Sequence, residues 1–138
     1  SFNEEVCMSG TIDIDERIRM TMDAADMAWW EMELPSGVVF FSDRKAALFG
    51  GKPKDFVHYT DYTKRLNKKE YETSMKLMRD HVEGNIPHYA TTYTVKGLDG
   101  ITRTLFDKGR VVRRDEDGTI KIMGVIVDIT EAPLKPNS

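Results

Sequence analysis

The residues most able to do chemistry in this sequence are few and far apart. The histidines His58, His81 and His88 form no three-histidine or histidine–carboxylate cluster at the spacing of metal ligands, so we predict no metal site. The single cysteine, Cys7, cannot form an intramolecular disulfide, and the chain has no Cys-x-x-Cys motif for zinc or c-type haem. A lone cysteine is typical of proteins in a reducing compartment, so we expect a cytoplasmic location.

Signatures of catalysis are also missing. Ser42, Asp43 and His58 supply the residue types of a catalytic triad, but nothing in the sequence positions them together. The run Gly50-Gly51-Lys52 lacks the register of a phosphate-binding loop, and no nucleophile elbow or dinucleotide fingerprint occurs. We therefore predict that this chain is not an enzyme.

The length and composition are those of one globular domain. The chain has 138 residues, of which 40% are hydrophobic and 31% charged, enough to bury a core without disulfides or a structural metal. The net charge is −3, with 20 basic residues spread among 23 acidic ones, so we expect no nucleic-acid partner. No apolar run approaches the roughly 20 residues of a membrane span, and we expect no membrane contact by this segment.

The first half of the chain predicts a helix, a hairpin and a short helix. Residues 11–26 begin with aspartates that can cap a helix, and residues 27–34 alternate in polarity like a strand. A turn at 35–37 leads to a second strand over 38–41, and a short capped helix follows over 43–49. The first helix has one apolar stripe with four-residue spacing, made of Ile14, Ile18 and Met22.

The second half predicts one long helix and three strands. Residues 52–67 have the least pattern and predict short helical turns and loops. Residues 68–83 predict a helix, and Gly109 suggests a bulge or a bend within the second of three following strands. The apolar stripe of that helix is Tyr71, Met75, Met78 and Val82, and the strands are expected at 87–96, 101–113 and 119–130.

These elements predict an α+β fold. Their order is that of a five-stranded antiparallel sheet with helices on one face, preceded by an N-terminal flanking helix. The last strand has apolar residues on both faces, so we expect it to be central and covered on both sides. We divide the chain into an N-terminal segment and helix (1–26), a globular domain (27–130) and the start of a linker (131–138).

Several motifs in this order resemble the PAS domain family. They are the aromatic hairpin 28–42, Ala47-Leu48-Phe49-Gly50, the segments 98–103, 109–113 and 115–118, and the exit 123–130 that ends in Asp-Ile-Thr. The resemblance runs from about Met27 to Thr130. It implies a sensory module in which a curved sheet and a helix enclose a small pocket. It also implies a parent protein with an effector domain, such as a sensor histidine kinase of a two-component system, a diguanylate cyclase or a transcriptional regulator.

The resemblance and the strand alternation together predict a pocket lining. The expected residues are Trp30, Met32, Phe41, Leu48, Met75, Met78, Tyr93, Val95, Leu105, Gly124 and Ile126. A mostly apolar lining suits either a small organic ligand or a filled core, and the sequence leaves both open. Gly124 favours some free space, because a missing side chain in a strand lets a group approach the backbone.

The resemblance also names cofactors that the residues can test. A covalently bound flavin or a thioester-linked chromophore needs a cysteine in the pocket, and both are excluded because Cys7 precedes the fold. Haem needs a histidine that faces the pocket, whereas His81 lies about 90° from the apolar stripe of its helix. We expect His81, His58 and His88 to be surface or hydrogen-bonded structural residues, and a haem-based redox or gas sensor is the third interpretation.

A second apolar surface is predicted on the opposite face of the sheet. It consists of Trp29, Met123, Val125 and Val127, and the flanking helix offers its stripe of Ile14, Ile18 and Met22. Either that helix packs on the sheet of its own chain or a second copy covers the face in a homodimer, and PAS domains commonly combine the two. A ligand-free dimerisation module is therefore the alternative to a ligand-binding sensor.

The end of the domain is predicted to pass a signal to the effector domain. Asp128 can pair with a basic side chain, for which Arg103 is the first candidate. Thr130 can cap a following helix through its hydroxyl group. With Ile129 between them, these residues would couple the sheet to an output helix.

Overall fold

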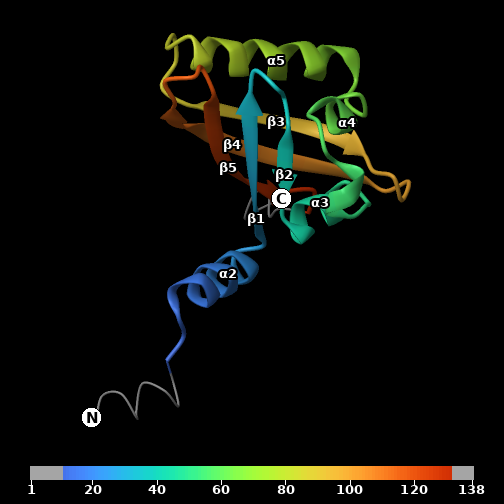
Figure 1. Ribbon diagram of the computed structural model, residues 1–138. Helices are drawn as coiled ribbons and strands as arrows, with labels where there is room; N and C mark the ends of the chain where they lie inside the picture. Colours follow the sequence, from blue (N-terminus) through green and yellow to red (C-terminus); the bar gives the residue numbers. More distant parts are fainter. Residues whose placement is uncertain (1–10, 132–138) are drawn as a thin grey trace, which may run out of the picture.

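The chain folds around one five-stranded antiparallel sheet (Figure 1). The computed structural model describes residues 11–131. The strands have the spatial order β2-β1-β5-β4-β3 and are β1 (Met27–Leu34), β2 (Val39–Phe41), β3 (Tyr89–Lys96), β4 (Thr102–Arg114) and β5 (Ile120–Asp128). The helices are α2 (Ile14–Ala24), α3 (Asp43–Leu48), the 3₁₀ helix η1 (Pro53–Asp55), α4 (Thr60–Thr63) and α5 (Lys68–Val82). The predicted α+β fold is confirmed.

Short-range sequence explains where the main helices begin. Asp13, Ser42 and Asn67 each have extended backbone and accept a backbone N–H from the first turn of α2, α3 and α5, at 2.8, 3.2 and 2.8 Å. Such caps satisfy donors that a helix cannot pair internally. The helix starts are therefore fixed by residues within three positions.

The core lies between the inner face of the sheet and the helices α3 to α5. Alternate residues of every strand point into it, as the period of a pleated strand requires. The fully buried apolar side chains of the sheet and the helices form one cluster, which includes Trp30, Phe41, Phe49, Phe56, Tyr93, Leu105, Ile122 and Ile126. This layer positions every residue of the candidate site.

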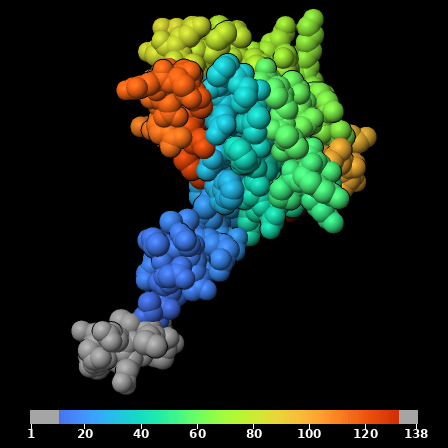
Figure 2. Space-filling view, viewed as in Figure 1, coloured from blue at the N-terminus to red at the C-terminus, as the bar shows by residue number. Residues whose placement is uncertain are grey.

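The outer face of the sheet is not covered by α2, so the expectation of a central strand covered on both sides is half wrong. β5 is central, and on its inner face Ile122 and Ile126 are fully buried. On its outer face Met123 is 39% exposed. The helix α2 runs away from the sheet (Figures 1 and 2), and Ile18 is 51% exposed.

Two local features, one of the backbone and one of side chains, explain the direction of α2. Asp26 has a positive φ of 55°, which turns the chain sharply between the helix and β1. The guanidinium group of Arg44 on α3 then pairs with Asp23 at 3.0 Å and with Asp26 at 3.7 Å. These contacts hold the C-terminal end of α2 beside α3 and leave Ile14 and Ile18 of its apolar stripe exposed, while Met22 is half-buried.

Two details of the strands and α5 also differ from the prediction. The bulge in β4 lies between Val111 and Arg113 and not at Gly109, which keeps a regular pair with Gly124. The buried residues of α5 are Ser74 and His81, whereas Tyr71 is 37% exposed. The helix is therefore rotated from its apolar stripe, so that a neighbouring face meets the sheet.

None of the helices within residues 11–131 is both long and apolar enough to cross a bilayer.

Candidate ligand cavity

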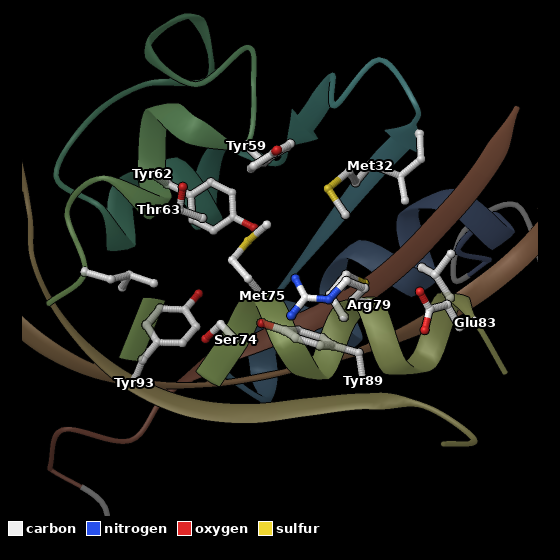
Figure 3. Close-up of a pocket in the computed structure, with 14 residues that line it drawn as sticks. Met32, Tyr59, Tyr62, Thr63, Ser74, Met75, Arg79, Glu83, Tyr89 and Tyr93 are labelled. Carbon is white, nitrogen blue, oxygen red and sulfur yellow. The ribbon is translucent and has the colours of Figure 1, made fainter. Parts of the chain in front are cut away.

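A cavity of about 220 Å³ lies between the sheet and the helices α4 and α5 (Figure 3). Its sheet wall comes from β1 and β3, and the opposite wall comes from α5 and the segment 59–66. Two exposed residues of α5 and its end, Arg79 and Glu83, contribute to the lining. The remaining lining consists of Met32, Leu34, Tyr59, Tyr62, Thr63, Leu66, Ser74, Met75, Met78, Val82, Tyr89 and Tyr93.

The predicted pocket residues divide between this cavity and the solid core. Met32, Met75, Met78 and Tyr93 line the cavity. Leu48 is half-buried on α3, away from the cavity. The other bulky members are buried in the core without reaching the cavity, and they are Trp30, Phe41, Val95, Leu105 and Ile126.

The space expected beside Gly124 is filled by the protein itself. Gly124 pairs directly with Trp30 of β1 on one side and with Gly109 of β4 on the other. A Cβ on Gly124 would collide with the Trp30 ring, and a Cβ on Gly109 would lie 2.7 Å from that ring. The two glycines therefore admit an indole ring of the same chain, which corrects the interpretation of Gly124 as room for a ligand.

Sequence reasoning missed much of the cavity lining. Tyr59, Tyr62 and Leu66 belong to the stretch without periodicity, so no pattern placed them in the interior. Ser74 is polar and lies outside the apolar stripe of its helix, although it is only 5% exposed. Alternation along the strand places Tyr89 on the same face of the sheet as Tyr93, and this signal could have identified Tyr89.

The polar groups of the cavity gather at its buried end. Figure 3 shows the hydroxyl groups of Ser74, Tyr89 and Tyr93 on the same side of the cavity. The Tyr93 hydroxyl donates a hydrogen bond of 3.0 Å to the buried carboxylate of Asp107. Within residues 11–131, the buried Ser74 hydroxyl makes no hydrogen bond of good geometry, although it lies close enough to the Tyr89 hydroxyl to lower the Tyr89 pKa. The polar end of the cavity thus keeps some capacity for hydrogen bonds to a ligand.

Beside the cavity, an ammonium group is buried among aromatic rings. Lys45 is 1% exposed, and its Nζ lies 4.2, 4.8 and 5.0 Å from the ring centres of Phe41, Trp30 and Tyr62. Such ring faces attract a cation electrostatically. Burial lowers the pKa of Lys45 from 10.5 to about 8, and the charge of Asp107 opposes that change.

Asp107 is the negative counterpart in this buried region. Burial raises its pKa, while Lys45 and the Tyr93 hydroxyl lower it. Burial raises the pKa of Tyr62, Tyr89 and Tyr93, and the charge of Asp107 raises it further in each case. The phenols at the buried end of the cavity are therefore protonated donors at neutral pH.

His81 is a hydrogen-bonded structural residue, as expected. Its Nε2 accepts the backbone N–H of Val111 at 2.9 Å, so its Nδ1 carries the proton and donates to the Ile86 carbonyl at 3.0 Å. His58 is likewise tied to Ser36 and Thr60 through its two ring nitrogens. The described part of the chain brings together no group of three His, Cys, Asp or Glu residues that could hold a metal. Cys7 lies outside the described residues.

The residues of the predicted dimer surface are exposed or half-buried. Trp29 pairs with Val125 on the outer face of the sheet and is 43% exposed. Val127 is half-buried there and Met123 is exposed, and Phe106 of β4 extends this surface. Ile18 and Met22 line a groove together with Trp29, although Ile18 is 51% and Ile14 67% exposed. Residues 11–131 thus leave large parts of both predicted apolar surfaces uncovered.

The exit from the domain is built differently from the prediction. Arg103 does not pair with Asp128, because its guanidinium group binds Asp99 at 2.8 Å and the Leu48 carbonyl at 3.0 Å. That contact with Arg103 lowers the pKa of Asp99. Arg103 therefore ties the turn before β4 to the end of α3.

Asp128, Ile129 and Thr130 instead bind each other and β4. The Asp128 carboxylate accepts the backbone N–H of Thr130 at 2.9 Å, and the Thr130 hydroxyl also binds it. The Thr130 Oγ1 accepts the backbone N–H of Thr104 at 2.8 Å, and the Ile129 N–H donates to the Thr104 carbonyl at 2.9 Å. The Thr130 hydroxyl is thus engaged with β4, and the predicted linker beyond residue 131 lies outside the described residues.

Comparisons with known proteins identify the fold. The sequence matches no protein-family model and no curated protein. Among solved structures, a sensory box histidine kinase/response regulator from Burkholderia thailandensis aligns with a TM-score of 0.67 and 17% identity, over 84% of this chain and 86% of that chain.

Two further structures agree. The N-terminal domain of a diguanylate cyclase with a PAS/PAC sensor from Marinobacter aquaeolei aligns with a TM-score of 0.64 and 19% identity, over 75% of this chain and 95% of that chain. A PAS domain from Colwellia psychrerythraea aligns with a TM-score of 0.64 and 14% identity, over 86% and 99%. The chain therefore has the PAS fold, which confirms the fold expected from the sequence motifs.

Proposed function

We propose that this domain is the sensory module of a larger signalling protein and that it binds a small organic ligand in the cavity under α5. The observation that carries this proposal is the cavity of about 220 Å³ with the Ser74 hydroxyl at its buried end, which makes no hydrogen bond of good geometry within the described part of the chain. Buried polar groups are nearly always hydrogen-bonded, because an unmade bond costs free energy. A ligand that fills the space and pairs this hydroxyl removes that cost.

The names of the similar structures support an effector domain in the parent chain. They include a histidine kinase and a diguanylate cyclase, and a transcriptional regulator is the third type that we propose. In this proposal residues 27–130 are the sensory domain, 1–26 the flanking segment and 131–138 the start of the linker. The signal leaves through Asp128, Ile129 and Thr130, whose bonds to β4 change when the sheet does.

The proposal assigns no reaction to this chain. It places the module in the cytoplasm, with no metal, nucleic acid or membrane among its contacts. A haem-based sensor is disfavoured by two observations. Both ring nitrogens of His81 are occupied by hydrogen bonds, and the cavity volume of about 220 Å³ is below the roughly 300–1,000 Å³ of sites for drug-sized ligands.

Native mass spectrometry of the freshly purified 138-residue chain tests the proposal. Extra mass that disappears on denaturation is the expected result. A Soret band in the absorption spectrum of the same sample would overturn the proposal in favour of haem. A clean mass equal to the sequence, together with no binding from a library of small ring compounds, would overturn it in favour of a ligand-free module.

A dimerisation module is the second candidate function, because the outer face of the sheet exposes Trp29 and Met123. We propose that a second copy covers this surface. Light scattering is expected to give twice the chain mass for the wild-type protein and the monomer mass for Trp29→Glu. Lys69→Glu, an exposed change on α5, is the matched control and should leave the dimer intact. A wild-type monomer at high concentration would refute this candidate.

A further inference from the structure

We propose that the cavity takes a neutral single-ring ligand with one hydrogen-bond donor, a phenol or a ring with one N–H group, which it directs at Ser74 and Tyr93. This inference rests on the proposed function, since it names the class of ligand for the same cavity. It follows from the volume of the cavity, the position of its polar groups and the charge behind them.

The volume limits the ligand to one ring. A cavity of about 150 Å³ is enough to hold benzene, and sites for drug-sized ligands have roughly 300–1,000 Å³. The observed volume of about 220 Å³ lies between these values. One ring with one or two small substituents therefore fits. The lining suits an aromatic ring, because it includes the rings of Tyr62 and Tyr89 and the adaptable side chains of Met75 and Met78.

The buried end of the cavity favours a donor. The Tyr93 hydroxyl donates its hydrogen bond to Asp107, so its oxygen can only accept a further hydrogen bond. Ser74 is 5% exposed, and its hydroxyl, which makes no hydrogen bond of good geometry within residues 11–131, can accept or donate. A ligand O–H or N–H can therefore be received by the Tyr93 oxygen or by Ser74, while the protonated hydroxyls of Ser74 and Tyr89 can serve a ligand acceptor. A hydroxyl group on the ligand can use both kinds of partner, whereas a group that only accepts leaves the Tyr93 oxygen without a donor.

The charges near the cavity exclude an anion at that end. Asp107 is fully buried behind Tyr93, and its carboxylate already receives the Tyr93 hydroxyl. An anionic ligand group would be buried beside that carboxylate and would also lose its hydration, and both effects oppose binding. A neutral donor avoids both. Of the two cations near the cavity, Lys45 is enclosed by aromatic rings, and Arg79 is an exposed residue of the lining whose charge is already hydrated.

Calorimetric titration of the full chain with four matched probes tests the inference. The probes are 4-methylphenol, 4-methylanisole, toluene and 4-methylbenzoate. We expect 4-methylphenol to bind about three- to tenfold more tightly than toluene, the value of one net hydrogen bond, and 4-methylbenzoate to bind most weakly. The methyl ether keeps the ring and the oxygen but lacks the donor for the Tyr93 oxygen, so it should bind more weakly than 4-methylphenol.

Two variants place the effect at Ser74. Ser74→Ala is expected to lower the affinity for 4-methylphenol about three- to tenfold and to change that for toluene less than about twofold. Thr73→Ala, on the exposed side of the same helix, is the control and should change neither. Met75→Phe reduces the cavity volume and should weaken all probes.

The outcomes separate the two proposals. If toluene, 4-methylanisole and 4-methylphenol bind equally, the ligand class is wrong and the proposed function stands. If 4-methylbenzoate binds best, the argument from charge is wrong. If no probe binds the wild-type protein at millimolar concentration, both the ligand class and the ligand-binding function are overturned.

Discussion

Lys45→Met is expected to change how the stability of the protein depends on pH. In the folded chain the pKa of Lys45 falls from 10.5 to about 8, chiefly because burial removes water from the ammonium group. Below pH 8 the native protein therefore keeps a buried charge, which costs about 3 kcal/mol relative to an exposed lysine. Between pH 8 and 10.5 the unfolded chain binds more protons than the native one, so the stability rises with pH.

The size of this change can be worked out for a practical pH range. From pH 7 to pH 9.5 the free energy of unfolding of the wild-type protein should rise by about 2 kcal/mol relative to that of Lys45→Met. The buried tyrosines are common to both proteins, so their contribution cancels. Removal of Lys45 also raises the pKa of Asp107, and this adds to the difference in the same direction.

The assay is urea denaturation at several pH values between 7 and 9.5. Lys69→Met, at an exposed position of α5, is the control and should follow the wild-type protein within about 0.5 kcal/mol at every pH. The reasoning is refuted if the difference between wild type and Lys45→Met stays constant over this range. Direct titration of the Lys45 ammonium group by NMR gives the same test for the wild-type protein alone.

Three substitutions test other contacts by denaturation and hydrogen exchange. Gly124→Ala should destabilise the protein by about 1–3 kcal/mol, because the new methyl group collides with the backbone carbonyl of Lys108 and with the Trp30 ring. Unchanged stability would show that the strand and the ring shift without cost. His81→Phe should lower the free energy of unfolding by about 1–3 kcal/mol, because it leaves the Val111 N–H without its acceptor. A smaller loss of stability for His81→Leu than for His81→Gln would contradict this explanation. Thr130→Val should lower the free energy of unfolding by about 1 kcal/mol and speed amide exchange at the start of β4. Unaltered exchange there would count against the hydrogen bond between the Thr104 N–H and the Thr130 hydroxyl.

Most of the fold could be predicted because its signals are local. Strand alternation correctly placed Trp30 and Tyr93 on the inner face of the sheet and Trp29 on the outer face. The caps Ser42 and Asn67 lie within one turn of the helices that they start. The bulge was misplaced at Gly109, because a glycine in a strand marks either a bulge or a close contact. Here the contact is the Trp30 ring, which belongs to a strand distant in the sequence.

The cavity could be predicted only in part because it depends on long-range packing. The rotation of α5 is set by hydrogen bonds from His81 to β4 and to the following loop, and these bring Ser74 inward. The burial of Lys45 contradicts the usual rule that lysines are exposed, and it requires aromatic rings from several elements around one ammonium group. No spacing in the sequence reports such a cluster.

The slot formed by Gly109 and Gly124 has a consequence for how this sequence can diverge. The Trp30 ring occupies the volume that side chains at both glycines would need, so the three positions cannot vary independently. Homologues with a tryptophan in the first strand should keep both glycines. Loss of the ring alone does not free these positions, because a Cβ at Gly124 also meets the backbone carbonyl of Lys108 and one at Gly109 meets that of Met123. Replacement of either glycine should therefore require both a smaller residue at position 30 and a shift of the neighbouring strand.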